Sequence, residues 1–351
     1  MHIVAFFSAL LFLVQHVWPL PIESDSQSVL DVTLIQADNT QIKAIVKNVG
    51  KEEITFVHLN FFRDSAPVKK VSVYRDDAEV PFQGIKRHIK LQGLSADAIT
   101  TLGIGEAMTD EFDIAATTDL TRGGSMTLHS SGLVHLVHDG TVSGHVPYRS
   151  NHLTIEVDAG KASQVVKAIQ TLDRRTRMGC DNDTVKEQLD NALAKTSALA
   201  AAAAVAARNG SEFKFNEYFK TTDQSVREVV AARLDAVARE ANSTTSATDY
   251  YCSDEFGYCE SNVLAYTIPS RNAIANCDIY YSYLLELTSA CHHQDRATTS
   301  LHEFTHAPGV FSPGTEDLGY GYAASTALQS REAVMNADTY ALYANAVYLD
   351  C

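Results

Sequence analysis

The 351-residue chain carries 43 acidic and 28 basic side chains, for a net charge of −15, and 45% of its residues are hydrophobic. This is the composition of a globular protein and excludes a disordered or collagen-like chain. The acidic balance argues against nucleic acid as a partner. The length is enough for two domains of ordinary size.

The first 19 residues predict a signal peptide. HIVAFFSALLFLVQHVWPL is an apolar run of suitable length, and no comparable run follows it. A buried core helix is the alternative, but the terminal position favours export and then cleavage between about residues 19 and 21. We therefore expect a secreted, extracellular protein without a membrane anchor.

Residues 20–175 predict an all-β pro-domain. Apolar and polar residues alternate along short runs that turn residues separate, which is typical of strands in a sandwich. The nine histidines of residues 1–175 are scattered over these runs, and we expect them on the surface. The predicted strands cover residues 29–37, 42–49, 54–62, 68–75, 124–137 and 152–160.

Arg174-Arg175 marks the predicted boundary between the pro-domain and a mature part over residues 176–351. The chain changes there from strand-rich and cysteine-free to helix-rich and cysteine-bearing. A basic pair at such a junction is the pattern of a site cut by a kexin-like processing protease. An ordinary basic linker is the alternative.

Residues 176–351 predict several helices and a small β-structure. All six cysteines lie in this part, and export permits disulfides between them, although the sequence alone allows fifteen pairings. No C-x2-C pair is present, which argues against a thiolate metal site. The predicted helices cover 184–210, 212–219, 221–242 and 336–350, and a strand pair held by cysteines is expected within 244–270.

The segment HEFTH, residues 302–306, predicts a metal site on a helix. His302 and His306 are one turn apart on one helical face, so both imidazoles can reach one ion. Glu303 lies beside them and can reach water at that ion. Asp295 is placed to cap the helix, and Pro308 ends it.

A catalytic zinc needs a third protein ligand, and several residues could supply it. Glycine and proline residues between 307 and 315 predict tight turns that bring position 316 or 317 back to the helix. These properties do not choose between the two. The candidates are the carboxylates of Glu316, Asp317 and Asp338 and the imidazoles of His292 and His293.

HEFTH followed by GTEDLGYG, residues 314–321, resembles the aspzincin metallopeptidases of the deuterolysin type. The resemblance covers the whole chain and implies that His302, His306 and Asp317 are zinc ligands and Glu303 the general base. It also gives catalytic roles to Tyr320 and Tyr280. Asp338, proposed as a ligand in this family, is expected to support the ligands.

This resemblance further implies an α+β fold, with a mainly helical zincin-like catalytic domain and a small β-sheet behind the all-β pro-domain. The implied protein is a neutral zinc endopeptidase with one Zn2+ per chain. It is expected to be a monomer that prefers basic proteins such as protamine and histones and has no nucleic-acid or membrane partner. The implied disulfides are 180–252, 259–277 and 291–351.

The charge of residues 176–351 agrees with a preference for basic substrates. This part has 12 Lys and Arg against 23 Asp and Glu, a net charge of −11, which attracts cationic chains. The charge could also serve solubility alone. The alternative functions are a zinc hydrolase of non-peptide bonds and a secreted zinc-containing binding protein.

Overall fold

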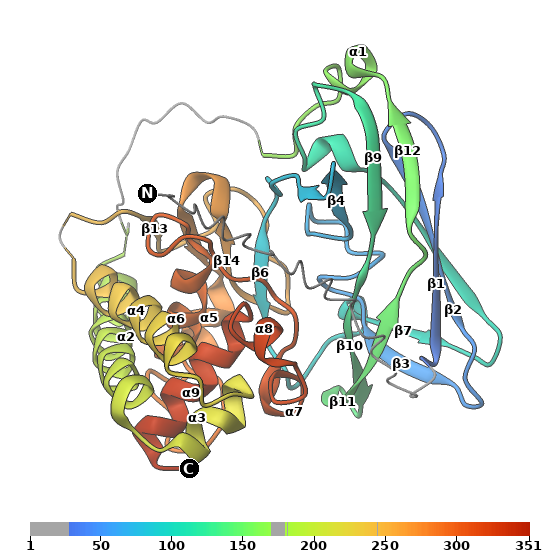
Figure 1. Cartoon of the computed structure of the whole chain (residues 1–351). Coiled ribbons are helices and arrows are strands. Elements are labelled where there is room, and N and C mark those ends of the chain that lie inside the picture. The colour runs from blue at the N-terminus through green and yellow to red at the C-terminus, as the bar shows by residue number, and fades with distance from the viewer. Residues whose placement is uncertain (1–27, 170–179, 181, 244) are drawn as a thin grey trace, which may run out of the picture.

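The computed structural model describes residues 28–169, 180, 182–243 and 245–351. The predicted signal peptide and the Arg174-Arg175 pair lie outside the described residues. The fold is mixed α/β and has several sheets. It divides into an N-terminal unit, residues 28–169, and a C-terminal unit, residues 180–351, which lie side by side (Figure 1).

The N-terminal unit is built mostly of short strands. Its elements are β1 (Leu30–Gln36), β2 (Gln41–Asn48), β3 (Ile54–Val57), β4 (Ser72–Arg75), β5 (Ala78–Glu79), β6 (Lys86–Ile89), the 3-10 helix η1 (Ala96–Ala98), β7 (Ile99–Leu102), β8 (Ala107–Asp113), the 3-10 helix η2 (Ile114–Ala116), β9 (Gly124–His129), β10 (Ser131–His138), β11 (Thr141–Arg149), β12 (Leu153–Val157) and the one-turn helix α1 (Ala159–Ala162).

Three antiparallel sheets enclose the core of this unit, in the strand orders β1-β2-β8, β11-β10-β3-β7 and β12-β9-β4-β5. Apolar and polar side chains alternate along these strands, so that one face of the strand is buried. Along β2, Ile42, Ala44 and Val46 are fully buried while the residues between them reach solvent. This pattern is why the sequence predicts β1 to β4 and β12.

The predicted strand over residues 124–137 is in fact two strands. β9 and β10 are separated at Ser130 and belong to different sheets. Five further strands of this unit, β5, β6, β7, β8 and β11, were not predicted. Only one residue of β8, Met108, is buried, and β11 contains Gly144 and Pro147, so neither has a clear strand pattern.

The C-terminal unit packs helices over a small sheet. Its elements are α2 (Asp183–Asn209), α3 (Glu212–Phe219), α4 (Gln224–Ala241), β13 (Asp249–Tyr251), β14 (Val263–Ile268), the 3-10 helix η3 (Pro269–Arg271), β15 (Ala273–Asn276), α5 (Asp278–Ser282), α6 (Arg296–His306), α7 (Gly321–Ser325), α8 (Ser330–Ala333) and α9 (Ala337–Leu349).

The long helices lie where the sequence predicts them. Alanines of α2 let α4 and α6 approach it closely, and Ala200, Ala203 and Ala204 are fully or almost fully buried in this contact. Helices α2, α4 and α9 all pack on α6, which therefore runs through the centre of the unit. Its central place keeps the residues of α6 away from water.

The small sheet has the strand order β13-β15-β14-β6. The predicted strand pair corresponds to β13 and β14, but the two do not pair with each other, because β15 lies between them. The fourth strand, β6, comes from the N-terminal unit and pairs antiparallel with β14. Figure 1 shows β6 between the two units, beside β14. An apolar cluster that includes Ile85, Ile89, Val263 and Tyr266 joins the units there.

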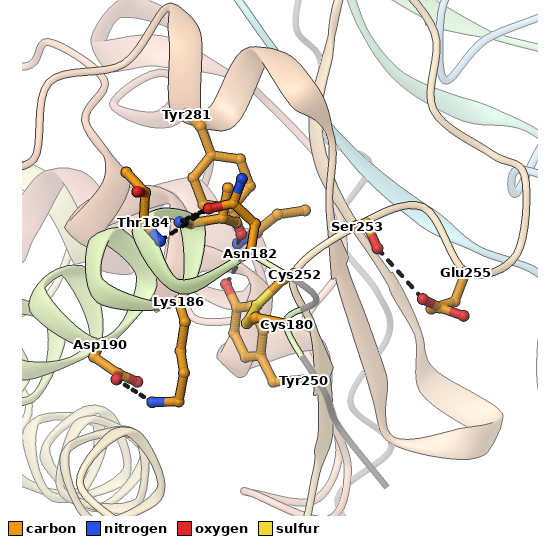
Figure 2. Close-up of a disulfide and its surroundings, with 12 residues drawn as sticks. Cys180, Asn182, Thr184, Lys186, Asp190, Tyr250, Cys252, Ser253, Glu255 and Tyr281 are labelled. Carbon is orange, nitrogen blue, oxygen red and sulfur yellow. Dashed lines mark hydrogen bonds and ion pairs between the residues drawn. A yellow bond between two sulfur atoms is a disulfide. The ribbon is translucent and has the colours of Figure 1, made fainter. Parts of the chain in front are cut away.

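Three disulfides connect Cys180 to Cys252, Cys259 to Cys277 and Cys291 to Cys351, which are the pairs that the family resemblance implies. Figure 2 shows the first, at the start of α2. Beside it the side chain of Asn182 caps α2 by accepting from the backbone N–H of Thr184 and Val185, at 2.9 and 3.3 Å.

Among the described helices, none combines the length and the apolar composition that crossing a membrane requires.

Candidate metal centre

Helix α6 carries both histidines of the HEFTH motif and is buried along almost its whole length. It begins after Asp295, whose carboxylate accepts from the backbone N–H of Thr298 at 2.7 Å. The hydroxyl of Thr298 in turn accepts from the backbone N–H of Asp295 at 3.2 Å, which completes a capping box. The helix ends at His306, just before Pro308, as predicted.

Three atoms from two segments converge at this helix. Nε2 of His302 and Nε2 of His306 are 3.1 Å apart, and Oδ1 of Asp317 is 3.1 Å from the first and 3.2 Å from the second. Both imidazoles are fully buried, and the Asp317 side chain is 10% exposed. These separations are close to the roughly 3.3 Å between ligands bound to one tetrahedral zinc at about 2.0 Å.

Hydrogen bonds on the far side of each ring determine which nitrogen faces this point. Nδ1 of His302 lies 3.3 Å from Oδ1 of Asp338, and Nδ1 of His306 lies 3.0 Å from the carbonyl oxygen of Thr315. An ionised carboxylate and a carbonyl can only accept, so each Nδ1 carries the proton and each Nε2 presents its lone pair. Two lone pairs and the Asp317 carboxylate thus meet without a proton between them, and a cation satisfies all three.

The segment Gly314–Gly321 brings Asp317 to the helix, and each motif residue has an identifiable part. At Gly314 a Cβ would lie 2.2 Å from the carbonyl oxygen of His306, so only glycine allows the chain to pass so close to the end of α6. Thr315 then donates its backbone N–H to the carbonyl oxygen of Thr305 at 2.9 Å and holds the ring of His306.

The second half of the motif is held from α9 and from the residue before it. Asn336 accepts from the backbone N–H of Leu318 at 2.9 Å and of Gly319 at 3.1 Å. Gly321 has a left-handed backbone (φ 75°) and donates its N–H to Oδ2 of Asp338 at 2.5 Å. Asp338 therefore ties the motif to His302. Burial opposes its ionisation, but His302 and His88 beside it hold its pKa below the usual range.

Glu303 is fully buried beside the three converging atoms. Its Oε2 accepts from the hydroxyl of Thr267 on β14 at 2.6 Å, while Oε1 has no hydrogen-bond partner among the described residues. Burial raises the pKa of Glu303 to about 8, although His302, Thr267 and the backbone N–H of His88 favour the charged form. A carboxylate whose pKa is raised toward neutrality can take up and release protons near pH 7.

The other predicted candidates for the third ligand have different partners. Glu316 lies in an ion pair with Lys86, at 2.5 Å, and Asp338 contacts the far side of His302. His292 accepts from or donates to the Tyr218 hydroxyl at 2.8 Å and stacks on Tyr322. His293 is absent from both described groups of residues that could hold a metal, as are Glu316, Asp338 and His292.

The two tyrosines named by resemblance differ in position. Tyr320 is buried with its ring near His302, and its hydroxyl donates to the carbonyl oxygen of Arg87 at 2.7 Å. The hydroxyl of Tyr280 instead contacts Ser300 at 2.8 Å and donates to the carbonyl oxygen of Arg296 at 3.2 Å. Both of these partners of Tyr280 are on α6, so its described contacts fix the helix.

The expectation that all histidines of the N-terminal segment are surface residues is wrong for His88 and His135. His88 stacks on His302 with ring centroids 3.9 Å apart and only 3° between the planes, and burial lowers its pKa to about 4. His88, His302 and Glu303 form a second group of possible ligand atoms. The strand that brings His88 here could not be read from a run as short and as basic as KRHI.

Two helix-borne imidazoles, one carboxylate and a buried glutamate beside them are a donor set that suits a catalytic zinc site better than a closed structural one. The chain belongs to the deuterolysin metalloprotease (M35) family, whose model matches residues 1–351. It is therefore a metalloprotease. Zinc is the metal that the family implies, and protein is the class of substrate.

Individual relatives match along nearly the whole chain. Penicillolysin of Penicillium citrinum is 64% identical over 345 residues, covering 98% of both chains. Neutral protease 2 of Aspergillus oryzae is 56% identical over 332 residues, covering 94% of both. A solved zinc peptidase from Grifola frondosa is 18% identical with a TM-score of 0.40, and the match covers 47% of this chain and 96% of that one.

Proposed function

We propose that this chain is the precursor of a secreted neutral zinc endopeptidase in which His302, His306 and Asp317 hold one zinc ion. The observation that carries this proposal is the convergence of the three ligand atoms, 3.1 to 3.2 Å apart, with both Nδ1 atoms already hydrogen-bonded. The donor set of two imidazoles and one carboxylate suits zinc and leaves a fourth position open.

Bound zinc supplies Lewis acidity, which activates water near pH 7 and polarises a peptide carbonyl. Glu303 is the general base: Oε1 takes the proton of the attacking water and passes it to the leaving nitrogen. Thr267 keeps the other oxygen, Oε2, in place. The hydroxyl of Tyr320 donates to the carbonyl oxygen as negative charge develops there.

We assign Tyr280 a positioning role through Ser300 and the carbonyl of Arg296 on α6, in place of the catalytic role that the resemblance implied. Asp338 is likewise a positioning residue, since it orients His302 and donates no atom to the three-atom cluster.

The organisation of the precursor follows from the sequence. Residues 1–19 are the signal peptide, residues 20–175 a β-rich pro-domain, and residues 176–351 a mainly helical catalytic domain. A kexin-like protease separates the last two at Arg174-Arg175. Three disulfides in the C-terminal unit suit an extracellular enzyme.

Basic proteins such as protamine and histones are the proposed preferred substrates of a monomeric enzyme. The net charge of −11 over residues 176–351 favours the approach of cationic chains and opposes that of nucleic acid or an anionic membrane. Because this attraction is screened by salt, raising ionic strength should slow cleavage of protamine more than cleavage of casein.

The test compares the processed wild-type protein with Glu303→Gln. Zinc content is measured by mass spectrometry and cleavage is followed on casein and protamine. We expect one zinc per chain in both proteins and a loss of cleavage of at least about a hundredfold in the variant. Equal cleavage by both proteins would refute the role of Glu303. A wild type that binds zinc and cleaves no protein would favour a binding protein or a non-peptide hydrolase.

A further inference from the structure

Strand β6 belongs to the N-terminal unit by sequence and to the C-terminal sheet by hydrogen bonding. It runs antiparallel to β14, with His88 opposite Ala265 and Lys86 opposite Thr267. The same Thr267 holds Glu303. Adding a strand to a free sheet edge is a general way to bind an extended peptide. The edge of β14 thus leads a polypeptide directly to the candidate metal centre.

One carbonyl group of β6 faces a proposed catalytic residue. The Tyr320 hydroxyl donates to the carbonyl oxygen of Arg87 at 2.7 Å. The ring of the next residue, His88, stacks on that of His302 with centroids 3.9 Å apart, so the Arg87–His88 bond lies beside α6. The hydrogen bond from Tyr320 is the contact that its proposed role requires with a carbonyl under attack.

The two side chains before this bond are basic, and each has an acidic partner in the C-terminal unit. Nζ of Lys86 lies 2.5 Å from Oε2 of Glu316 and donates to the carbonyl oxygen of Thr315 at 2.7 Å. Nη1 of Arg87 lies 3.0 Å from Oε1 of Glu260. The Lys86 side chain is 8% exposed and that of Arg87 is fully buried, whereas the side chains of Glu316 and Glu260 are 31% and 38% exposed, so water screens each pair from its acidic side.

Removal of the N-terminal unit would leave Glu260 and Glu316 without their basic partners. Arg87 is also paired with Asp64, and Glu316 also faces Lys69 at 3.7 Å, and both of these residues belong to the N-terminal unit. Glu260 and Glu316 remain in the C-terminal unit and lose their cations. Two carboxylates of the C-terminal unit are then left to bind basic side chains of another chain.

We propose that Lys86–Ile89 lies in the position and direction of a substrate chain, with the Arg87–His88 bond at the reaction centre. Glu260 and Glu316 are then the specificity-determining acceptors for basic side chains at the last and the next-to-last position before the cleaved bond. The proposal rests on the proposed endopeptidase function. It attributes the preference of that enzyme for basic proteins to Glu260 and Glu316.

The reaction at this position is hydrolysis. Water adds its oxygen to the carbonyl carbon of the residue in the place of Arg87, the C–N bond to the next residue breaks, and the leaving nitrogen gains a proton through Glu303. In the uncleaved chain β6 fills this position. The cavity that borders Asp317 and Tyr320 holds only about 130 Å³, below the roughly 300 Å³ of a small-molecule site. A substrate chain therefore reaches the centre after the N-terminal unit has left.

The experiment uses protein expressed as the full chain and then processed, so that folding occurs with the N-terminal unit present. The probe is the fluorescein-labelled decapeptide QGIKRHIKLQ, residues 83–92, with one version that carries Lys86→Gln and another that carries Arg87→Gln. Binding is measured by anisotropy to the Glu303→Gln protein, which does not turn the peptide over. Cleavage by the wild type is located by mass spectrometry.

A double-mutant cycle isolates each acceptor. Glu316→Gln should weaken binding of the native decapeptide about tenfold and that of the Lys86→Gln peptide less than twofold. Glu260→Gln should cost about threefold with the native peptide and little with the Arg87→Gln peptide, because Glu260 is 38% exposed. Equal losses for both peptides would overturn the assignment of that acceptor.

Glu187→Gln is the matched control, since it removes one exposed acidic charge from α2 and should weaken all three peptides equally and slightly. If Glu316→Gln misfolds, the peptide substitutions alone test the acceptors. Equally tight binding of the native and the Lys86→Gln peptides would then contradict the role of Glu316. Wild-type cleavage between Arg and His supports the register, and a cut elsewhere overturns it. Failure to cleave casein as well would instead refute the proposed function.

Discussion

Both units of this chain bury polar residues, but the C-terminal unit gathers many of them on one helix. The main core of the N-terminal unit is formed by apolar side chains of alternating strands, such as Val32, Ile42 and Met126. In the C-terminal unit, α6 buries His302 and Glu303 completely, as part of an almost wholly buried helix. An apolar core can exchange one hydrophobic side chain for another at modest cost, whereas a buried polar network depends on every partner. The comparison locates the functional constraint in the C-terminal unit.

The units also differ in covalent constraint. All three disulfides lie in the C-terminal unit, and one of them links the last residue, Cys351, to Cys291, a few residues before α6 begins. The N-terminal unit has no cysteine. This difference agrees with the proposed organisation, in which a pro-domain discarded after folding needs only transient stability while an extracellular enzyme must remain folded on its own.

The sharpest test of this comparison is Asp317→Ala. Removing one of three ligands should lower zinc affinity by more than about a hundredfold and abolish cleavage, because two imidazoles alone do not complete the site. Zinc content of the uncleaved chain and casein cleavage after processing are the measurements. A variant that keeps its zinc, whether or not it cleaves, would show that Asp317 is not a ligand.

Asp119→Ala in the N-terminal unit is the matched control for that substitution. Asp119 is exposed and only caps a turn, by accepting from the backbone N–H of Thr121 at 3.1 Å. Its loss should leave zinc content unchanged. If both substitutions reduced zinc equally, the two units would not differ in the way that their burial patterns indicate.

Periodicity explains what the sequence could predict in each unit. Long regular patterns gave α2, α3, α4 and α9, and capping residues together with Pro308 gave the bounds of α6. In the N-terminal unit, the alternating pattern gave β1, β2 and β12 equally clearly, but not the strands without such a pattern. The motif residues Gly314 to Gly321 each have a local role, which is why so short a segment predicts the site.

Long-range pairing explains what could not be predicted. All four residues of β6 are buried although three of them are basic or imidazole side chains, since partners on the other unit compensate them. No local pattern in KRHI shows that Glu316 or Glu260 will be there. Thr267 and Asn336 were missed for the same reason, because their contacts with Glu303 and Gly319 span 36 and 17 residues.

The disulfides permit a prediction of intermediate size. Replacing Cys291 and Cys351 by serine opens a loop of 60 residues and should lower the free energy of unfolding by about 4 kcal/mol in the chain-entropy model. Replacing Cys259 and Cys277, only 18 apart, should cost about 3 kcal/mol by the same relation. Urea unfolding of the processed proteins measures both. The reverse order would mean that loop entropy does not govern the stability of this unit.

The smallest predicted effect concerns the first turn of the C-terminal unit, next to the Cys180–Cys252 disulfide (Figure 2). Asn182→Ala removes the cap of α2 and should lower the free energy of unfolding by about 1 kcal/mol, as urea unfolding would measure. Because Asn182-Asp-Thr is also a glycosylation sequon, the substitution removes a glycan acceptor as well.

Asn182→Asp separates these two causes, since aspartate caps a helix about as well as asparagine but cannot carry an N-linked glycan. If the cap matters, Asn182→Asp keeps the stability of the wild type and Asn182→Ala does not. Equal destabilisation by both would place the contribution in the glycan. Neither substitution should change zinc content, because α2 contacts α6 through its buried alanines and Thr196, and these residues lie well after the first turn of α2.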